Sequence, residues 1–82
     1  MKTPRDIGGQ ELAETLHKFG FEITRQTGSH MRLTSRYTGI EAHVTIPVHK
    51  PLAIGTLSSI LGEVAGYLHE DKQKLEDELF KN

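Results

Sequence analysis

The segment GFEITRQTGSHMRL, residues 20–33, decides the fold of this chain. Its first half alternates apolar and polar residues, which predicts a half-buried strand at about 21–26. The pair Thr27-Gly28 is typical of a short turn, and the alternating run behind it predicts a second strand at about 29–35. The segment therefore predicts two neighbouring antiparallel strands joined by a tight turn.

A third strand is expected at about 41–46, after a turn at Tyr37-Thr38-Gly39. Successive side chains of a strand point to opposite faces of the sheet. One face of the second and third strands would hold Met31, Leu33, Ala42, Val44 and Ile46, and the other would hold His30, Arg32, Thr34, His43 and Thr45. The first face needs a cover, whereas the second is expected to stay open.

A helix is expected before the strands. Leu12, Leu16 and Phe19 recur at the spacing of one helix face, which predicts an amphipathic helix at about 10–19. Gly20 would end it, because a glycine without a Cβ is favoured in the left-handed conformation at a helix C-terminus.

A second helix is expected after the strands, beyond a loop bracketed by Pro47 and Pro51. Thr56 is its expected N-cap, and Gly66 is expected to interrupt it. Its apolar positions are Leu57, Ile60, Leu61 and Val64. The free N–H groups of its first turn could hold an anion, although capping is the preferred interpretation.

The order of elements predicts an α+β fold, a two-layer sandwich of a helix, three antiparallel strands and a second helix, with both helices covering the apolar face of the sheet. We expect a single domain over residues 1–82, with its core at about 8–68 and an acidic C-terminal helix at about 70–80. That last helix would either cap the core or shield the basic side of the sheet.

The composition narrows the class of protein. A chain of 82 residues is near the small end of what folds alone. It has no cysteine, which excludes disulfides and thiolate chemistry and fits a reducing cytosol. No apolar run approaches the roughly 20 residues that cross a bilayer, and there is no signal-like start. We therefore expect a soluble cytoplasmic protein with no membrane segment.

The net charge of −1 at pH 7 does not indicate a nucleic-acid binder, but the distribution of charge is uneven. The middle of the chain is mildly basic, and the segment after Glu63 is acidic. The bases of the middle are Lys18, Arg25, Arg32, Arg36 and Lys50. This asymmetry allows contact with phosphates without establishing it.

His30 is the first candidate for chemistry. An imidazole on an open face can give or take a proton near neutral pH, and Arg32 would follow it on the same face within about 7 Å. Gly28 and Ser29 would shape the turn before it. An imidazole beside a held phosphate suits RNA cleavage, in which a base removes the 2′-hydroxyl proton and cations stabilise the charge at phosphorus. The alternative is that His30 is an ordinary polar residue of a solvated strand.

The other histidines are weaker candidates. His43 is either a second acid or base or an ordinary exposed residue. His49, next to Lys50 in a loop, either contacts an anion or is simply solvated. His30, His43 and His49 lack the short spacing, the cysteines and the second ligand shell of a zinc site, so no metal site is expected.

Taken together, these motifs resemble the HicA (YcfA-like) family of toxin–antitoxin systems. The matching elements are Gly20-Phe21, Arg25-Gln26, Gly28-Ser29-His30, Val44-Thr45-Ile46-Pro47, His49, Gly55-Thr56-Leu57 and Ser59-Ile60-Leu61. The resemblance extends from about Gln10 to Leu68.

The resemblance implies a fold like that of a double-stranded-RNA-binding domain. It also implies an mRNA interferase, a ribosome-independent and metal-independent endoribonuclease toxin without a cofactor, whose catalytic histidine falls on His30. A HicB-type antitoxin would cover the open face of the sheet. The residues expected to contact the mRNA are Gly28, Ser29, Arg32, His49 and Lys50. The alternatives left open are a non-cleaving RNA-binding module and an antitoxin-binding module of the same fold.

Overall fold

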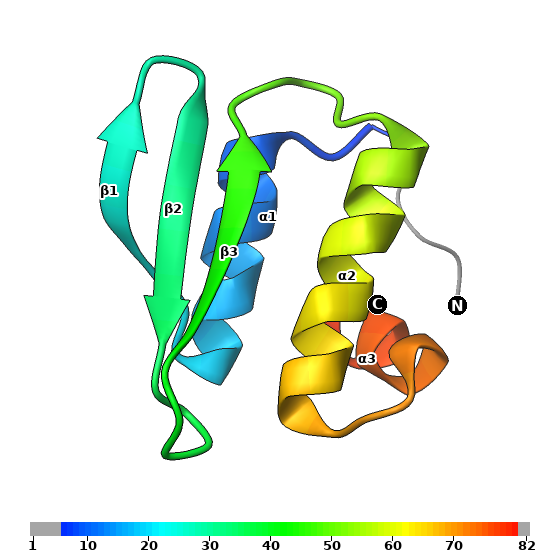
Figure 1. Ribbon diagram of the computed structural model, residues 1–82. Coiled ribbons are helices and arrows are strands. Elements are labelled where there is room, and N and C mark those ends of the chain that lie inside the picture. Colours follow the sequence, from blue (N-terminus) through cyan, green and yellow to red (C-terminus); the bar gives the residue numbers. More distant parts are fainter. Residues whose placement is uncertain (1–5, 81–82) are drawn as a thin grey trace.

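The computed structural model describes residues 6–80, so residues 1–5 and 81–82 of the expected domain lie outside the described residues. The elements, in chain order, are α1 (Gly9–Thr15), the 3₁₀ helix η1 (Leu16–Phe19), β1 (Glu22–Thr27), β2 (His30–Ser35), β3 (Ala42–Pro47), α2 (Ile54–Leu68) and α3 (Lys72–Phe80). The three strands form one antiparallel sheet in the order β1-β2-β3 (Figure 1). The predicted α+β architecture is confirmed.

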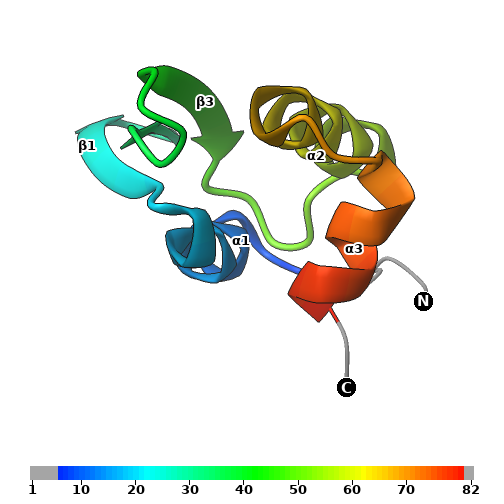
Figure 2. The same ribbon diagram turned by 90° about the horizontal axis from the view of Figure 1, so that it is seen from below.

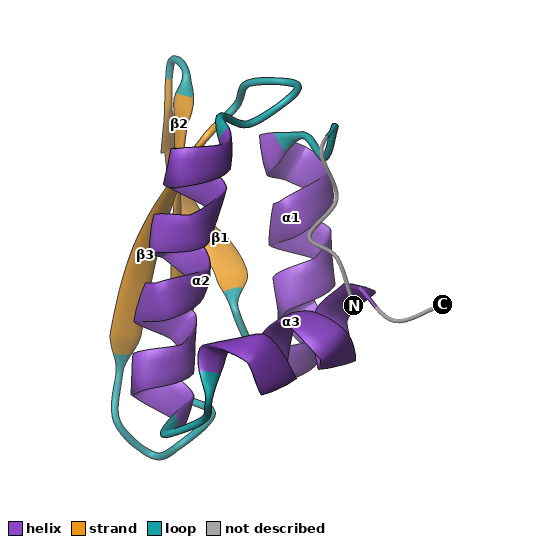
Figure 3. Ribbon diagram, turned by 90° about the vertical axis from the view of Figure 1, so that its right-hand side faces the viewer, coloured by secondary structure: helices purple, strands orange, loops and turns teal. Residues whose placement is uncertain are grey.

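The helices meet the sheet in two different ways. Helix α1 packs behind the sheet, whereas α2 runs alongside β3 at the level of the sheet (Figures 2 and 3). Helix α3 lies with α1 in the second layer. The apolar face of the sheet is thus covered by α1 and closed along its β3 edge by α2, so the opposite face and the adjoining side of α2 form one continuous surface.

A single core lies between the two layers. It is built from Leu12, Ala13, Leu16, Phe19, Phe21, Met31, Leu33, Val44, Ile46, Leu52, Leu57, Ile60, Leu61, Val64, Ala65 and Leu75. The alternation predicted for β2 is confirmed, because Met31 and Leu33 are fully buried while His30 and Arg32 are exposed. Among residues 6–80 the one buried polar residue is Ser35, whose hydroxyl donates to the carbonyl of Phe19 at 2.7 Å.

The first helix begins at a point of close backbone contact. The N–H of Gly9 donates to the carbonyl of His49 at 2.9 Å, and a Cβ at Gly9 would lie only 1.9 Å from the carbonyl oxygen of Pro47. The N–H of Gly8 donates to Oε1 of Glu11 at 2.7 Å. The predicted helix is confirmed, with a last turn of 3₁₀ type that ends at Gly20, where φ is +77°.

Strand β1 differs from the half-buried strand predicted for it. All six of its residues are exposed, and even Ile23 keeps 44% of its surface accessible. The reason is that β1 packs mainly against β2, whereas β3, at the other edge of the sheet, also packs against α1 and α2. The register of β1 with β2 shifts between Ile23 and Arg25, so Thr24 is an extra, bulged residue. As a consequence Arg25 is the direct partner of Arg32.

Helix α2 starts earlier than predicted. The N-cap is Ala53 and not Thr56, because the N–H of Leu57 already bonds to the carbonyl of Ala53 at 2.9 Å. Thr56 therefore lies inside the helix. No side chain forms a capping hydrogen bond at this end of the helix. The helix is stabilised mainly by burial of its apolar face.

The predicted interruption of α2 at Gly66 is wrong. The next residue, Tyr67, holds the last turn in place, since its hydroxyl donates to the carbonyl of Ile40 at 2.5 Å and accepts the N–H of Thr38 at 3.1 Å. The helix ends instead at His69, which takes the left-handed conformation with φ +57°. These tertiary contacts offset the roughly 1 kcal/mol that a glycine costs in a helix.

Helix α3 caps the core, as one of the two alternatives had it. Leu75 is fully buried, Lys18 donates from Nζ to the carbonyl of Glu78 at 3.2 Å, and the Lys72 ammonium donates to the Ser58 hydroxyl. The helix lies away from the open face of the sheet (Figure 2), so it does not shield that face. Within residues 6–80 no helix is long and apolar enough to cross a membrane.

Candidate active site on the open sheet face

A groove of about 440 Å³ runs between the open face of the sheet and the N-terminal half of α2. Its sheet side is lined by His30, Thr45 and Pro47, and its helix side by Gly55, Thr56, Ser59, Ile60 and Glu63. The groove exists because α2 lies beside β3. The imidazole predicted from the sequence therefore lies at the edge of a concave surface that is lined by both polar and apolar residues.

His30 is placed by the hairpin turn between β1 and β2. Gly28 adopts φ +52°, which favours glycine, and no atom lies near the Cβ that another residue would add there. The carbonyl of Ser29 accepts the N–H of Val48 at 2.7 Å, which ties the turn to the segment after β3. This hydrogen bond holds the turn against the segment after β3, although the turn lies at the surface.

The hydroxyl of Ser29 lies 3.3 Å from Nδ1 of His30. No other hydrogen bond or ion pair engages this imidazole among residues 6–80, so Nε2 is available to a ligand. A neutral imidazole that accepts a proton at Nε2 carries its own proton on Nδ1. The Ser29 hydroxyl oxygen can accept a hydrogen bond from that Nδ1–H group and so favour the tautomer that a general base needs.

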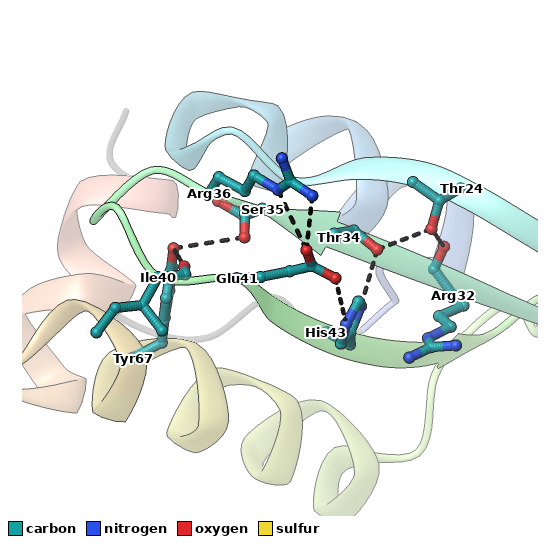
Figure 4. A network of polar contacts seen from close by, with 9 residues as sticks. All are labelled: Thr24, Arg32, Thr34, Ser35, Arg36, Ile40, Glu41, His43 and Tyr67. Carbon is teal, nitrogen blue, oxygen red and sulfur yellow. Dashed lines mark hydrogen bonds and ion pairs between the residues drawn. The ribbon is translucent and has the colours of Figure 1, made fainter.

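Arg32 follows His30 on the same face of β2. It faces Thr45 of β3 on one side and Arg25 of β1 on the other. The guanidinium of Arg32 points away from the polar network beside it (Figure 4). Arg32 thus lies on the same exposed face as His30, and its contact with a phosphate stays a prediction.

His49 and Lys50 lie elsewhere. They line a separate pocket of about 280 Å³ at the start of α1, together with Gly8, Gly9, Gln10, Glu11 and Val48. The ammonium of Lys50 lies 3.5 Å from Oε1 of Glu11. The Gly8 N–H and the Lys50 charge lower the pKa of Glu11. The structure thus does not bring His49 and Lys50 together with His30 in the groove.

His43 faces Thr34 across β2 and β3, as expected, but both of its ring nitrogens are engaged (Figure 4). Nδ1 lies 2.9 Å from the Thr34 hydroxyl, and Nε2 lies 2.9 Å from Oε2 of Glu41. Glu41 in turn accepts from Arg36 at 2.8 Å, and this hydrogen bond and the Arg36 charge lower the pKa of the carboxyl. His43 therefore belongs to an exposed polar network with Thr34 and Glu41.

The three histidines considered as zinc ligands occupy three different places. His30 lies in the groove, His43 in the polar network and His49 in the pocket at α1. In the part of the chain that the structure describes, no group of three or more histidine, aspartate or glutamate side chains is placed to hold a metal ion.

Two features of the open surface were not predicted, the helix side of the groove and the position of Arg25 on the sheet. Thr56, Ser59 and Glu63 enter the site from α2, and their role depends on where that helix lies, for which the sequence carries no local signal. Arg25 reaches the open face through the bulge at Thr24. Strict alternation from Phe21 would have placed Arg25 on the apolar face.

The comparisons with known proteins identify the family of this chain. A family model described as the HicA toxin of bacterial toxin–antitoxin systems matches residues 9–66, which is more than half of the chain. The matched segment contains every residue that lines the groove. No curated protein and no solved structure matches significantly. The chain belongs to the HicA toxin family of bacterial toxin–antitoxin systems, which implies an antitoxin partner.

Proposed function

We propose that this protein is a ribosome-independent, metal-independent endoribonuclease that cleaves mRNA in the cytoplasm and thereby arrests translation. Membership in a toxin family supports the proposal. The observation that carries it is the His30 imidazole, which is exposed at the groove, positioned by Ser29 at Nδ1 and available at Nε2. His30 is the proposed catalytic residue.

The proposed reaction is an internal transesterification. Nε2 of His30 takes the 2′-hydroxyl proton while the 2′-oxygen attacks the adjacent phosphorus. The bond from phosphorus to the 5′-oxygen breaks, and the imidazolium returns its proton to that oxygen. The products are a 2′,3′-cyclic phosphate and a 5′-hydroxyl. Arg32, whose Cα lies about 7 Å from that of His30 along β2, holds a phosphate of the same strand beside the imidazole.

The main-chain groups of Gly28 and Ser29 are proposed to contact the RNA strand where it enters the groove, because both residues are exposed beside His30. His49 and Lys50 are proposed as a more distant contact, since Lys50 carries an exposed positive charge at the pocket near α1. That contact should serve binding rather than the chemical step.

A HicB-type antitoxin is the proposed partner. The open face has no cover within residues 6–80, and the catalytic imidazole lies on it. A partner seated on this face would block access of RNA to His30. It would also stabilise a small domain, because a ligand that binds only the folded state shifts the folding equilibrium.

The test is induced expression of the wild type, His30→Ala and His17→Ala, followed by growth and by analysis of total RNA. His17 is the matched control, since it is an exposed histidine on η1, outside the groove. We expect growth arrest and mRNA loss with the wild type and His17→Ala only, and relief on co-expression of a HicB-type antitoxin. Arrest without RNA loss would favour a non-cleaving binding module and contradict the proposal.

A further inference from the structure

The bulge in β1 brings two arginines into direct opposition. Ile23 faces Leu33 and the next paired residue, Arg25, faces Arg32, so Thr24 has no partner of its own. The hydroxyl of Thr24 is used instead on the open face, where it lies 2.8 Å from the Thr34 hydroxyl and donates to the carbonyl of Arg32 at 3.3 Å (Figure 4). These two bonds hold the bulge in position.

Directly opposed side chains of an antiparallel pair have Cβ atoms about 4.5–5.5 Å apart, and like charges placed there are destabilising. Neither Arg25 nor Arg32 forms a side-chain hydrogen bond or an ion pair with any residue from 6 to 80. In contrast, Arg36, in the turn between β2 and β3, is neutralised by Glu41. The fold thus keeps two uncompensated positive charges together on the face that carries His30.

We propose that Arg25 and Arg32 form a single binding site for a backbone phosphate of the RNA strand. Two guanidinium forks can donate to both non-bridging oxygens of one phosphodiester, which is the planar recognition that arginine provides and lysine does not. The bound anion removes the repulsion between the two side chains. Arg25 is therefore a positioning residue, which fixes the path of the strand relative to His30 through a phosphate and does not take part in proton transfer.

This inference rests on the proposed function, because it assigns RNA as the ligand. An acidic segment of a protein partner is the other ligand that such a pair could attract. The RNA backbone is favoured by position, since the Cα atoms of Arg32 and His30 lie about 7 Å apart on the same face of the same strand. A single-stranded nucleic acid offers phosphates at a regular spacing, so one phosphate can reach the pair while the next lies near His30.

The experiment measures binding of a 2′-O-methyl RNA oligonucleotide, which lacks the attacking hydroxyl and therefore stays intact. The variants are Arg25→Gln, Arg25→Lys and, as a control of equal charge change, Lys74→Gln on the exposed side of α3. We expect Arg25→Gln to weaken binding about 10-fold and to reduce the slope of log K against log salt by about 0.7. Arg25→Lys should retain the slope and lose part of the affinity, and Lys74→Gln should change neither.

A second measurement separates this role from a structural one. Relief of the like-charge pair should raise the melting temperature of Arg25→Gln by about 1–4 °C, whereas Lys74→Gln should not raise it. A fall in the melting temperature of Arg25→Gln would overturn the proposed repulsion. Equal RNA binding by the wild type and Arg25→Gln would overturn the phosphate site and assign the pair to a protein interface.

The proposed ribonuclease function and the proposed phosphate site can be contradicted independently. If the wild type binds the 2′-O-methyl RNA through Arg25 but does not cleave unmodified RNA, the phosphate site stands and the ribonuclease function is wrong. If it cleaves RNA and Arg25→Gln binds and cleaves equally well, only the phosphate site is wrong. If the wild type binds no RNA at all, both are wrong.

Discussion

The hydroxyl of Ser29 lies 3.3 Å from Nδ1 of His30, within the two-residue turn that connects β1 to β2. The carbonyl of the same serine accepts the N–H of Val48. One residue thus fixes both the turn and the orientation of the imidazole. The catalytic proposal depends on this contact, because an imidazole free to rotate would present Nε2 to the groove only part of the time.

Ser29→Ala should therefore lower kcat of RNA cleavage by about 2- to 10-fold, since a single hydrogen bond contributes about 0.5–1.5 kcal/mol. KM should change little, because the phosphate contacts remain. Ser29→Thr keeps the hydroxyl and should recover most of the rate. The measurement is steady-state cleavage of a short RNA; an unchanged kcat for Ser29→Ala would remove Ser29 from the positioning of His30.

A substitution at Gly9 tests the fold. A Cβ at Gly9 would lie 1.9 Å from the carbonyl oxygen of Pro47, where β3 ends, so α1 would have to move away from the sheet. Gly9→Ala should lower the free energy of unfolding by about 2–3 kcal/mol. Urea-induced unfolding measures this change directly.

The matched control for Gly9 is Gly62→Ala. Gly62 lies in the middle of α2, and an added Cβ there meets no atom within 4 Å. The substitution should stabilise the protein by up to about 1 kcal/mol, because alanine is the better helix former. Equal effects of the two substitutions would show that the close approach of α1 to β3 does not exist.

The open face could be predicted from the sequence because apolar and polar residues alternate strictly along β2. Met31 and Leu33 alternate with His30 and Arg32 without a break, and burial follows that alternation. The same reasoning failed in β1, where one extra residue at Thr24 reverses the faces beyond it. Bulges depend on pairing with the neighbouring strand, so a local pattern does not reveal them.

In helix α2, tertiary contacts override the local sequence signals for the helix ends. Thr56 has the side chain of a good N-cap, and Gly66 has the flexibility of a helix end, yet neither has that role. Burial of Leu57 and Leu61 and the hydrogen bonds of Tyr67 extend the helix past both. The helix side of the groove was missed for the same reason, because the sequence does not say where α2 lies.

The acid dependence of stability should include a contribution from Glu11. The Gly8 N–H and, next, the Lys50 charge lower the pKa of this carboxyl in the folded state. A lowered folded pKa gives stability that is present above the unfolded pKa and is lost as the pH falls through the folded pKa. Glu11→Gln should thus be less stable than the wild type at pH 7 and equally stable near pH 2.

Urea unfolding of the wild type and Glu11→Gln at several pH values measures the difference. Lys50→Met should reduce the same difference, since Lys50 is one of the two causes of the shift. The wild type and Glu11→Gln could instead differ in free energy of unfolding by the same amount at pH 7 and near pH 2. That result would mean that the carboxylate charge at the start of α1 does not contribute to stability.

The central claim is that His30 carries out the cleavage of RNA. The most direct measurement is the single-turnover rate of cleavage of a defined RNA by the purified wild type, His30→Ala and His43→Ala, each with and without EDTA. His43 is the control because its ring is exposed on the same face and already engaged by Thr34 and Glu41. We predict that the cleavage rate falls at least about 100-fold in His30→Ala and is unchanged in His43→Ala. EDTA should leave the rate of each protein unchanged. Equal rates for the wild type and His30→Ala would contradict the account.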